Sequence, residues 1–335
     1  MKPAGPIPFY TGSFAAVMAT GIVSTALLLY HQTLISDILM GVGVLFYLLL
    51  WYRYMARLIR TPQAMWDDLT NAATTFGFMT IVAGSNVLAV RFLLAHWLGL
   101  AVVLGTIALV IWALMFYTVM TALIVGPAIE LSAVNGGWLI AIVAQQSIAT
   151  FLAVVITASP SHADSLFLIS TTFWAMGVIL YLVFIVLIID RLLFRDVEWA
   201  DLQPPYWINM GATAITVLAS SRLLVIHLRT PALLTLRPFL EGFTLMLWAW
   251  GTWWIPLLVI LGLWKYWRGK ESVRYHPSQW SIVFPLGMYS TATTTMARIP
   301  GFEPLHRIGA GFVWIALAAW LLVAALGVRA AVLKA

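Results

Sequence analysis

Six residues in the segment 280–298, spaced three or four apart, place hydroxyl, aromatic and cationic groups on one face of a helix. They are Ser281, Phe284, Met288, Thr291, Thr295 and Arg298. Hydroxyl dipoles replace part of an ion's hydration shell, and a guanidinium attracts anions. The stripe therefore favours a path for anions, with the ring of Phe284 as a constriction. Pro285 has no N–H to bond the carbonyl of Ser281, so a bend is expected there. The alternative is that Phe284 is ordinary core packing.

Four other apolar segments also carry small and hydroxyl residues at their centres, each after a glycine. The candidate lining residues in them are Ser13, Thr20, Ser24, Thr80, Gly84, Asn86, Gln145 and Ser220. This similarity recurs at a period of roughly 60–70 residues, which predicts one helical hairpin used five times. Buried amides need partners, and a wet lumen supplies them. The alternative is that the small residues only allow close helix packing in lipid.

Three arginines fall at equivalent ends of such segments: Arg91, Arg222 and Arg298. Together they are predicted to form a basic vestibule that concentrates anions. The competing interpretation for each is that its side chain reaches out to lipid headgroups.

The acidic and metal-binding residue types exclude several function classes. All 12 Asp and Glu lie in connectors or near the ends of apolar segments, whereas cation carriers and proton pumps place a carboxylate near the membrane midplane. The 6 His do not cluster, there are 0 Cys, and no phosphate-binding loop occurs. We expect no metal and no cofactor, and an intramembrane enzyme is a remote alternative. No basic stripe with exposed aromatics points to nucleic acid.

The composition requires a membrane environment for these segments. Of 335 residues, 62% are hydrophobic and 9% are charged, far below the roughly 25% of soluble domains. We predict a single transmembrane domain over 1–335, all-α, with ten spans forming five hairpins. The odd spans form an inner ring around a central pore, and the bulkier even spans form an outer ring. The spans are 13–30, 34–54, 72–94, 97–119, 138–157, 165–189, 208–227, 239–264, 280–298 and 308–328.

Loop charge predicts the orientation of the chain in a cell (inner) membrane. The side that holds both termini carries most of the 18 basic residues, so both termini are predicted to be cytoplasmic. These residues are Lys2, Arg53, Arg57, Arg60, Arg191, Arg195, Lys265, Arg268, Lys270, Arg274, Arg329 and Lys334. The other side has Arg91, Arg222, Arg229, Arg237, Arg298 and Arg307.

Three segments resemble one transporter family. The residues VMATGIVS at 17–24, TFGF at 75–78 with GSNVL at 84–88, and WSIVFPLGMY at 280–289 resemble its first, third and ninth helices. This is the tellurite-resistance and C4-dicarboxylate transporter family, which includes malate carriers, sulfite exporters and slow-type anion channels. The resemblance implies ten helices in five hairpins, a pore through the inner helices and a homotrimer. It also implies that Phe284 is a pore gate.

Two functions remain open at this point. The first is a passive channel for small anions: inorganic anions, sulfite or C4-dicarboxylates such as malate. The second is a proton-coupled C4-dicarboxylate or sulfite carrier, with a site near Thr20, Gln145 and Arg298. Carriers usually need inverted repeats and broken helices, whereas five hairpins of one direction suggest a ring, which favours the channel.

Overall fold

The computed structural model describes residues 9–226, 228, 230–269 and 274–333. Within these residues the chain folds into α-helices joined by short turns and 3₁₀ segments. Lys2, Arg229, Lys270 and Lys334, which entered the orientation prediction, lie outside the described residues.

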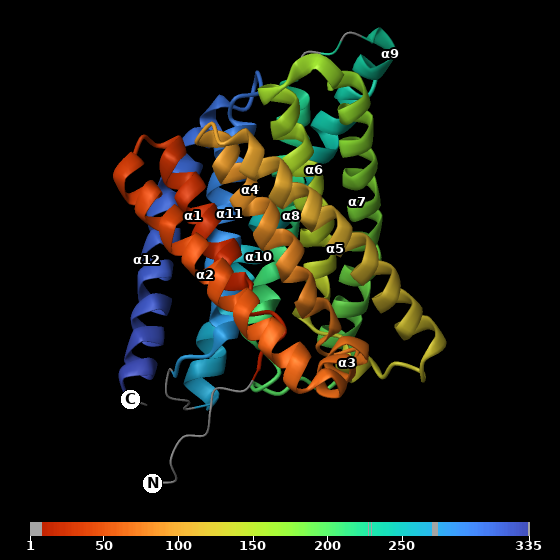
Figure 1. The fold of residues 1–335 in the computed structure, drawn as a ribbon, viewed down its shortest axis with the longest axis vertical. Coiled ribbons are helices and arrows are strands. Elements are labelled where there is room, and N and C mark those ends of the chain that lie inside the picture. Colours follow the sequence, from red (N-terminus) through yellow and green to blue (C-terminus); the bar gives the residue numbers. More distant parts are fainter. Residues whose placement is uncertain (1–8, 227, 229, 270–273, 334–335) are drawn as a thin grey trace.

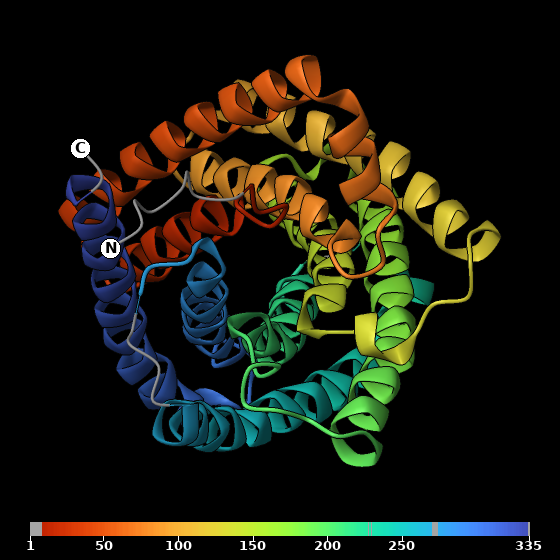
Figure 2. The same cartoon turned by 90° about the horizontal axis from the view of Figure 1, so that it is seen from below.

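Five helices form a closed inner ring. Each contacts the next in the order α1, α4, α6, α8, α11, and α11 contacts α1 again. Seen along the ring axis, the five surround a common centre (Figure 2). Their bounds are α1 Ala15–Leu29, α4 Thr80–Leu94, α6 Ile140–Ala158, α8 Ile208–Leu224 and α11 Trp280–Met296.

Five longer helices lie outside this ring, and each packs on the inner helix that precedes it in the chain. Burial separates the two layers: 89% of the most apolar stretch is buried in Gly136–Ala158, which contains α6, against 17% in Glu303–Val332, which contains α12. The outer helices therefore present large apolar side chains outward. They are α2 Thr33–Arg60, α5 Leu98–Val125, α7 Ala163–Phe194, α10 Arg237–Gly269 and α12 His306–Val332.

Two short helices mark the opposite ends of the bundle (Figure 1). Helix α3 (Pro62–Thr70) lies at the end where α1 begins and α12 ends, and α9 (Pro231–Leu234) lies at the other. These ends are called the α3 end and the α9 end below.

Glycines set the close approach of the inner helices. A Cβ atom on Gly211 of α8 would lie 2.9 Å from the ring of Pro285, and one on Gly21 of α1 would lie 2.7 Å from Val87. A Cβ on Gly287 of α11 would meet Ile22 at 2.9 Å. These three glycines therefore allow neighbouring inner helices to pack closely, as small residues do in membrane helix packing.

Four of the inner helices begin with a 3₁₀ turn at the α3 end. These turns are η1 (Thr75–Met79), η3 (Gly136–Leu139), η5 (Pro204–Trp207) and η6 (Pro277–Gln279), and each contacts the next. A Cβ on Gly136 would clash with the carbonyl of Pro205, so η3 and η5 meet backbone to backbone.

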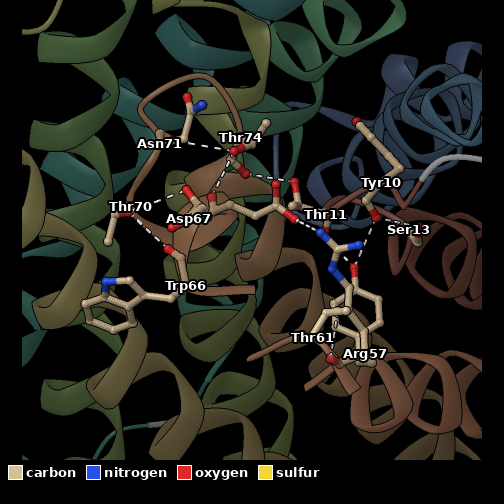
Figure 3. Close-up of polar contacts among 12 residues, drawn as sticks. Tyr10, Thr11, Ser13, Arg57, Thr61, Trp66, Asp67, Thr70, Asn71 and Thr74 are labelled. Atoms are coloured by element: carbon tan, nitrogen blue, oxygen red, sulfur yellow. Dashed lines mark hydrogen bonds and ion pairs between the residues drawn. The ribbon is translucent and has the colours of Figure 1, made fainter. Parts of the chain in front are cut away.

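Side-chain contacts fix the start of α1 against the segment before α4 (Figure 3). The Thr11 hydroxyl donates to the carbonyl of Thr74 (2.8 Å), and the Thr74 hydroxyl donates to the carbonyl of Asp68 (2.8 Å). Asp68 also pairs with Arg57 of α2, whose guanidinium lies 4.1 Å from the centre of the Phe9 ring. These contacts position the rim of the α3 end.

Each predicted span overlaps one α-helix of at least 15 residues, and the fold class is all-α over the described residues. Seven of the described helices are long and apolar enough to cross a membrane; α1, α8 and α11, with 15, 17 and 17 residues, are shorter. The prediction that ten helices cross the membrane therefore stays a prediction. The outer helices run past their predicted ends, as α2 does to Arg60. Helices α3 and α9 were not predicted.

Candidate functional site

A polar chamber lies inside the ring at the α3 end. Its volume is about 410 Å³, and every inner helix contributes the segment that precedes or begins it. Arg191 of α7 reaches this chamber, but it is bound to the carbonyl of Val134 and pairs with Asp201 at 3.4 Å. Burial lowers the pKa of His276, which also lines the chamber, so this imidazole is neutral at neutral pH. The chamber is therefore polar without a free strong charge.

A second, small cavity lies further along the axis, towards the α9 end. Its volume is about 20 Å³, close to the space that one water needs. All five inner helices line it, and no Asp or Glu is among the described lining residues. This space is called the central cavity below. It is lined by Ile22, Thr25, Asn86, Val87, Val90, Ser147, Thr150, Val154, Ile215, Leu218, Arg222, Met288 and Thr291.

Phe284 lies between the two spaces along α11. It is one turn before Met288, on the face that lines the central cavity, and its side chain is 1% exposed. One turn before the cavity residues on α1, α6 and α8 stand Met18, Val143 and Gly211. Phe284 is thus the aromatic side chain among these four positions, and α11 continues as a helix through Pro285.

Arg222 is the charged residue of the central cavity. Its Nε atom is buried without a hydrogen-bond partner among the described residues, and it forms no described ion pair. Arg298 at the end of α11 is exposed, and it lies near enough to Arg222 for the two charges to repel. Two of the three predicted vestibule arginines therefore meet at the α9 end, with Arg222 turned inward.

The third, Arg91, is held in a different way. Its side chain is 2% exposed and pairs with Asp37 of α2 at 2.5 Å. It also donates from Nε to the Ser24 hydroxyl (3.0 Å) and from Nη2 to the Ser36 hydroxyl (3.2 Å). Arg91 and Ser24 thus tie α4, α1 and α2 together. The charge of Arg91 is neutralised, so it does not contribute a free cation to a vestibule.

We expect Asp37→Asn to destabilise the protein without changing the anion path. Removing one partner of a buried pair costs about 3–5 kcal/mol. Asp37 is 60% exposed and two serines still bind Arg91, so we expect about 1–2 kcal/mol here. Thermal unfolding in detergent measures the loss. The double variant Asp37→Asn with Arg91→Met should recover most of it; an equally unstable double variant would contradict this role for the pair.

Most other predicted lining residues bind outer helices or their own backbone. The Thr20 hydroxyl accepts from the Trp320 indole of α12 (2.9 Å), and the Ser220 hydroxyl accepts from Thr244 of α10 (2.6 Å). Neither lines the central cavity. Gln145 is fully buried and does not line the cavity either, and neither of its amide atoms has a partner among the described residues.

The remaining predicted residues lie at the ends of the inner helices or in their contacts. Ser13 and Thr80 bond carbonyls of the preceding turn, at Tyr10 and Gly77. Ser281 is buried in the first turn of α11, and Thr295 donates to the carbonyl of Thr291. A Cβ on Gly84 would lie 3.4 Å from Val17 of α1, so this glycine serves helix packing.

The structure brings together Asn86, Met288, Thr291 and Arg222 from the predicted set. Sequence reasoning missed the cavity residues Thr25, Ser147 and Thr150. Ser147 and Thr150 lie three residues apart in the sequence, so they share one face of the helix. That face is opposite the one that carries Gln145.

The sequence matches known proteins over almost its whole length. The profile of the voltage-dependent anion channel family matches residues 8–328. Two uncharacterized transporters of Methanocaldococcus jannaschii are each 26% identical, over 93% of this chain and 92% and 90% of their own lengths. An uncharacterized membrane protein of Mycobacterium tuberculosis is 39% identical over 40% of this chain and 68% of its own length. The chain is therefore a membrane protein that belongs to the voltage-dependent anion channel family.

Proposed function

We propose that this protein is a channel that passes small anions through its inner ring, across the cytoplasmic membrane. The observation that carries the proposal is the central cavity, which all five inner helices line and which has Arg222, without a described ion pair, among its lining residues. An unpaired guanidinium in a low-dielectric site attracts an anion strongly. No described carboxylate lines this cavity to attract a cation instead.

Phe284 is the proposed gate. The chamber at the α3 end and the central cavity lie on either side of its level, and its ring is buried there. The small volume of the central cavity fits a resting state that is closed to hydrated ions. Conduction then requires the ring to move, and Pro285 beside it lacks the N–H that would hold the helix rigid.

The ten-span arrangement is part of the same proposal. The segments 204–224 and 277–296, which add η5 and η6 to α8 and α11, are as long as the span Thr75–Leu94. Arg57, Arg191 and Arg268 belong to the α3 end, and this excess of positive charge supports the proposal that the α3 end faces the cytoplasm. The exposed apolar outer helices face membrane lipids, and we propose a homotrimer on the resemblance to the transporter family.

Because the wild-type protein is proposed to rest closed, purified Phe284→Ala protein in planar bilayers separates this channel from the alternative carrier. Chloride, nitrate and malate should each carry current that does not saturate at low concentration. Silent bilayers with saturable malate or sulfite uptake that follows a pH gradient would establish a proton-coupled carrier and overturn the channel.

A further inference from the structure

An apolar groove opens on the outer wall of the bundle, between the last turns of α7 and the second half of α10. Its volume is about 500 Å³, and all of its described lining residues are hydrophobic. On α10 the lining runs from Trp253 to Trp264, which is about 17 Å at the rise of an α-helix. This length is close to one leaflet, half of a hydrocarbon core roughly 30 Å thick. The groove therefore has the length and the chemistry of a site for a lipid acyl chain.

A smaller and more polar pocket follows this groove towards the end of α10. Its volume is about 70 Å³, and Leu202 and Leu261 line both spaces, so the two adjoin. Lys265, Tyr266 and Gln203 add an ammonium, a phenol and an amide to the lining of this pocket. The polar groups thus lie beyond the apolar groove, in the same order as the headgroup and the chain of a lipid.

Lys265 brings a charge that the described part of the protein does not neutralise. Its side chain is half-buried and forms no ion pair with a described residue. The acidic residues of the segment after α7, Asp196 and Glu198, do not line the pocket. Arg268, in the last turn of α10, adds a second positive charge nearby. Basic residues at the membrane surface attract anionic lipid headgroups.

Gly262 leaves the pocket open beside this charge. It lines the pocket one turn before Lys265, and a Cβ atom built on it would meet no atom within 4 Å. Any larger residue at this position would therefore occupy the pocket without displacing protein atoms. The missing side chain is what leaves room for a ligand next to the ammonium of Lys265.

From these features we propose that the groove and the pocket together bind an anionic phospholipid from the leaflet at the α3 end. One acyl chain lies in the groove along α10, and the phosphate binds Lys265, with Tyr266 and Gln203 as further donors. A zwitterionic lipid brings its own cation to its phosphate, so it gains less from Lys265. The site lies on the outer wall, and it does not depend on whether the inner ring conducts.

Phosphatidylglycerol and phosphatidylcholine with identical acyl chains are the matched probes. Added to purified wild-type protein in micelles of an uncharged detergent, phosphatidylglycerol should raise the melting temperature at an about fivefold lower concentration than phosphatidylcholine does. This factor corresponds to about 1 kcal/mol, the attraction expected from one lysine near an anionic headgroup. Glycerol 3-phosphate, an anionic phosphate ester without acyl chains, should have no effect at the same concentration, because it cannot bury apolar surface in the groove.

Two variants with matched controls test the pocket itself. Gly262→Leu fills the pocket, and the open space around its Cβ predicts a folded protein in which the preference for phosphatidylglycerol is lost. Gly242→Leu is its control: it makes the same change on α10, also in open space, but lies outside the groove and the pocket. Lys265→Gln should remove the preference as well, whereas Arg329→Gln, which removes an exposed charge near the end of α12, should retain it.

Equal stabilisation of the wild-type protein by the two lipids would overturn the proposal, and this comparison needs no variant to fold. A preference that persists in Gly262→Leu or in Lys265→Gln would overturn it too. Glycerol 3-phosphate acting as strongly as phosphatidylglycerol would assign the pocket to a soluble phosphate ester instead. A smaller oligomer of Gly262→Leu, with no difference between the lipids, would assign it to contact between copies of the chain. None of these measurements uses anion flux, so the lipid site and the channel can fail separately.

Discussion

Replacing Phe284 with Ala should raise anion conductance at least about a hundredfold. In the proposed path the ring lies between the α3-end chamber and the central cavity, and Met18, Val143 and Gly211 one turn before the cavity are smaller or more flexible. Removing the ring joins the two spaces. A hundredfold rise in conductance corresponds to a contribution of about 2.7 kcal/mol from the ring to the barrier for anion passage. Chloride efflux from liposomes, with matched amounts of reconstituted protein, measures the change.

The control must separate an opened path from a loosened core. Truncating a buried Phe costs about 3–5 kcal/mol of stability wherever it sits. Phe167 of α7 is equally buried but belongs to an outer helix, so Phe167→Ala should lose stability and leave efflux unchanged. Equal efflux from wild type and a well-folded Phe284→Ala would refute the gate.

Replacing Arg222 with Gln in the open Phe284→Ala background should lower conductance about tenfold at low anion concentration. The variant loses the unpaired charge of the central cavity, and a tenfold effect corresponds to about 1.4 kcal/mol of lost attraction. The dependence of conductance on ionic strength should weaken as well. Arg222→Lys keeps the charge and should retain most of the conductance.

Arg307 provides the matched control for this charge. It is exposed at the start of α12, at the same end of the bundle, and it does not line the central cavity. Arg307→Gln changes the net charge by the same amount and should leave conductance at low concentration nearly unchanged. A similar loss in both variants would mean that Arg222 acts only through the general surface potential.

The sequence predicted the fold better than it predicted the lining. Hydrophobic length sufficed to predict an all-α membrane protein, because the length of an apolar segment does not depend on contacts with other helices. The inner helices are buried on all sides, so hydrophobicity does not reveal which face points to the centre. Thr20 and Ser220 lie among small residues as a lining residue would, yet their hydroxyls bond Trp320 and Thr244 of outer helices.

The arginines illustrate the same limit. Arg91 and Arg222 stand at equivalent places in the repeat, but Asp37 neutralises only Arg91. Asp37 and Arg91 fall at the same end of neighbouring spans, so their pairing was open to prediction. The inward position of Arg222 depends on how α8 is rotated about its own axis. The packing of Gly211 against Pro285 of α11 fixes this rotation. A contact between two helices cannot be read from the sequence of one of them.

The sign of a reversal potential shows whether anions or cations pass through the inner ring. Purified Phe284→Ala is reconstituted in a planar bilayer with a tenfold gradient of potassium chloride. If anions use this path, we expect a large current that reverses within a few millivolts of the chloride equilibrium potential, about 59 mV from zero. Reversal near the potassium potential, or near zero, would contradict an anion path lined by Arg222.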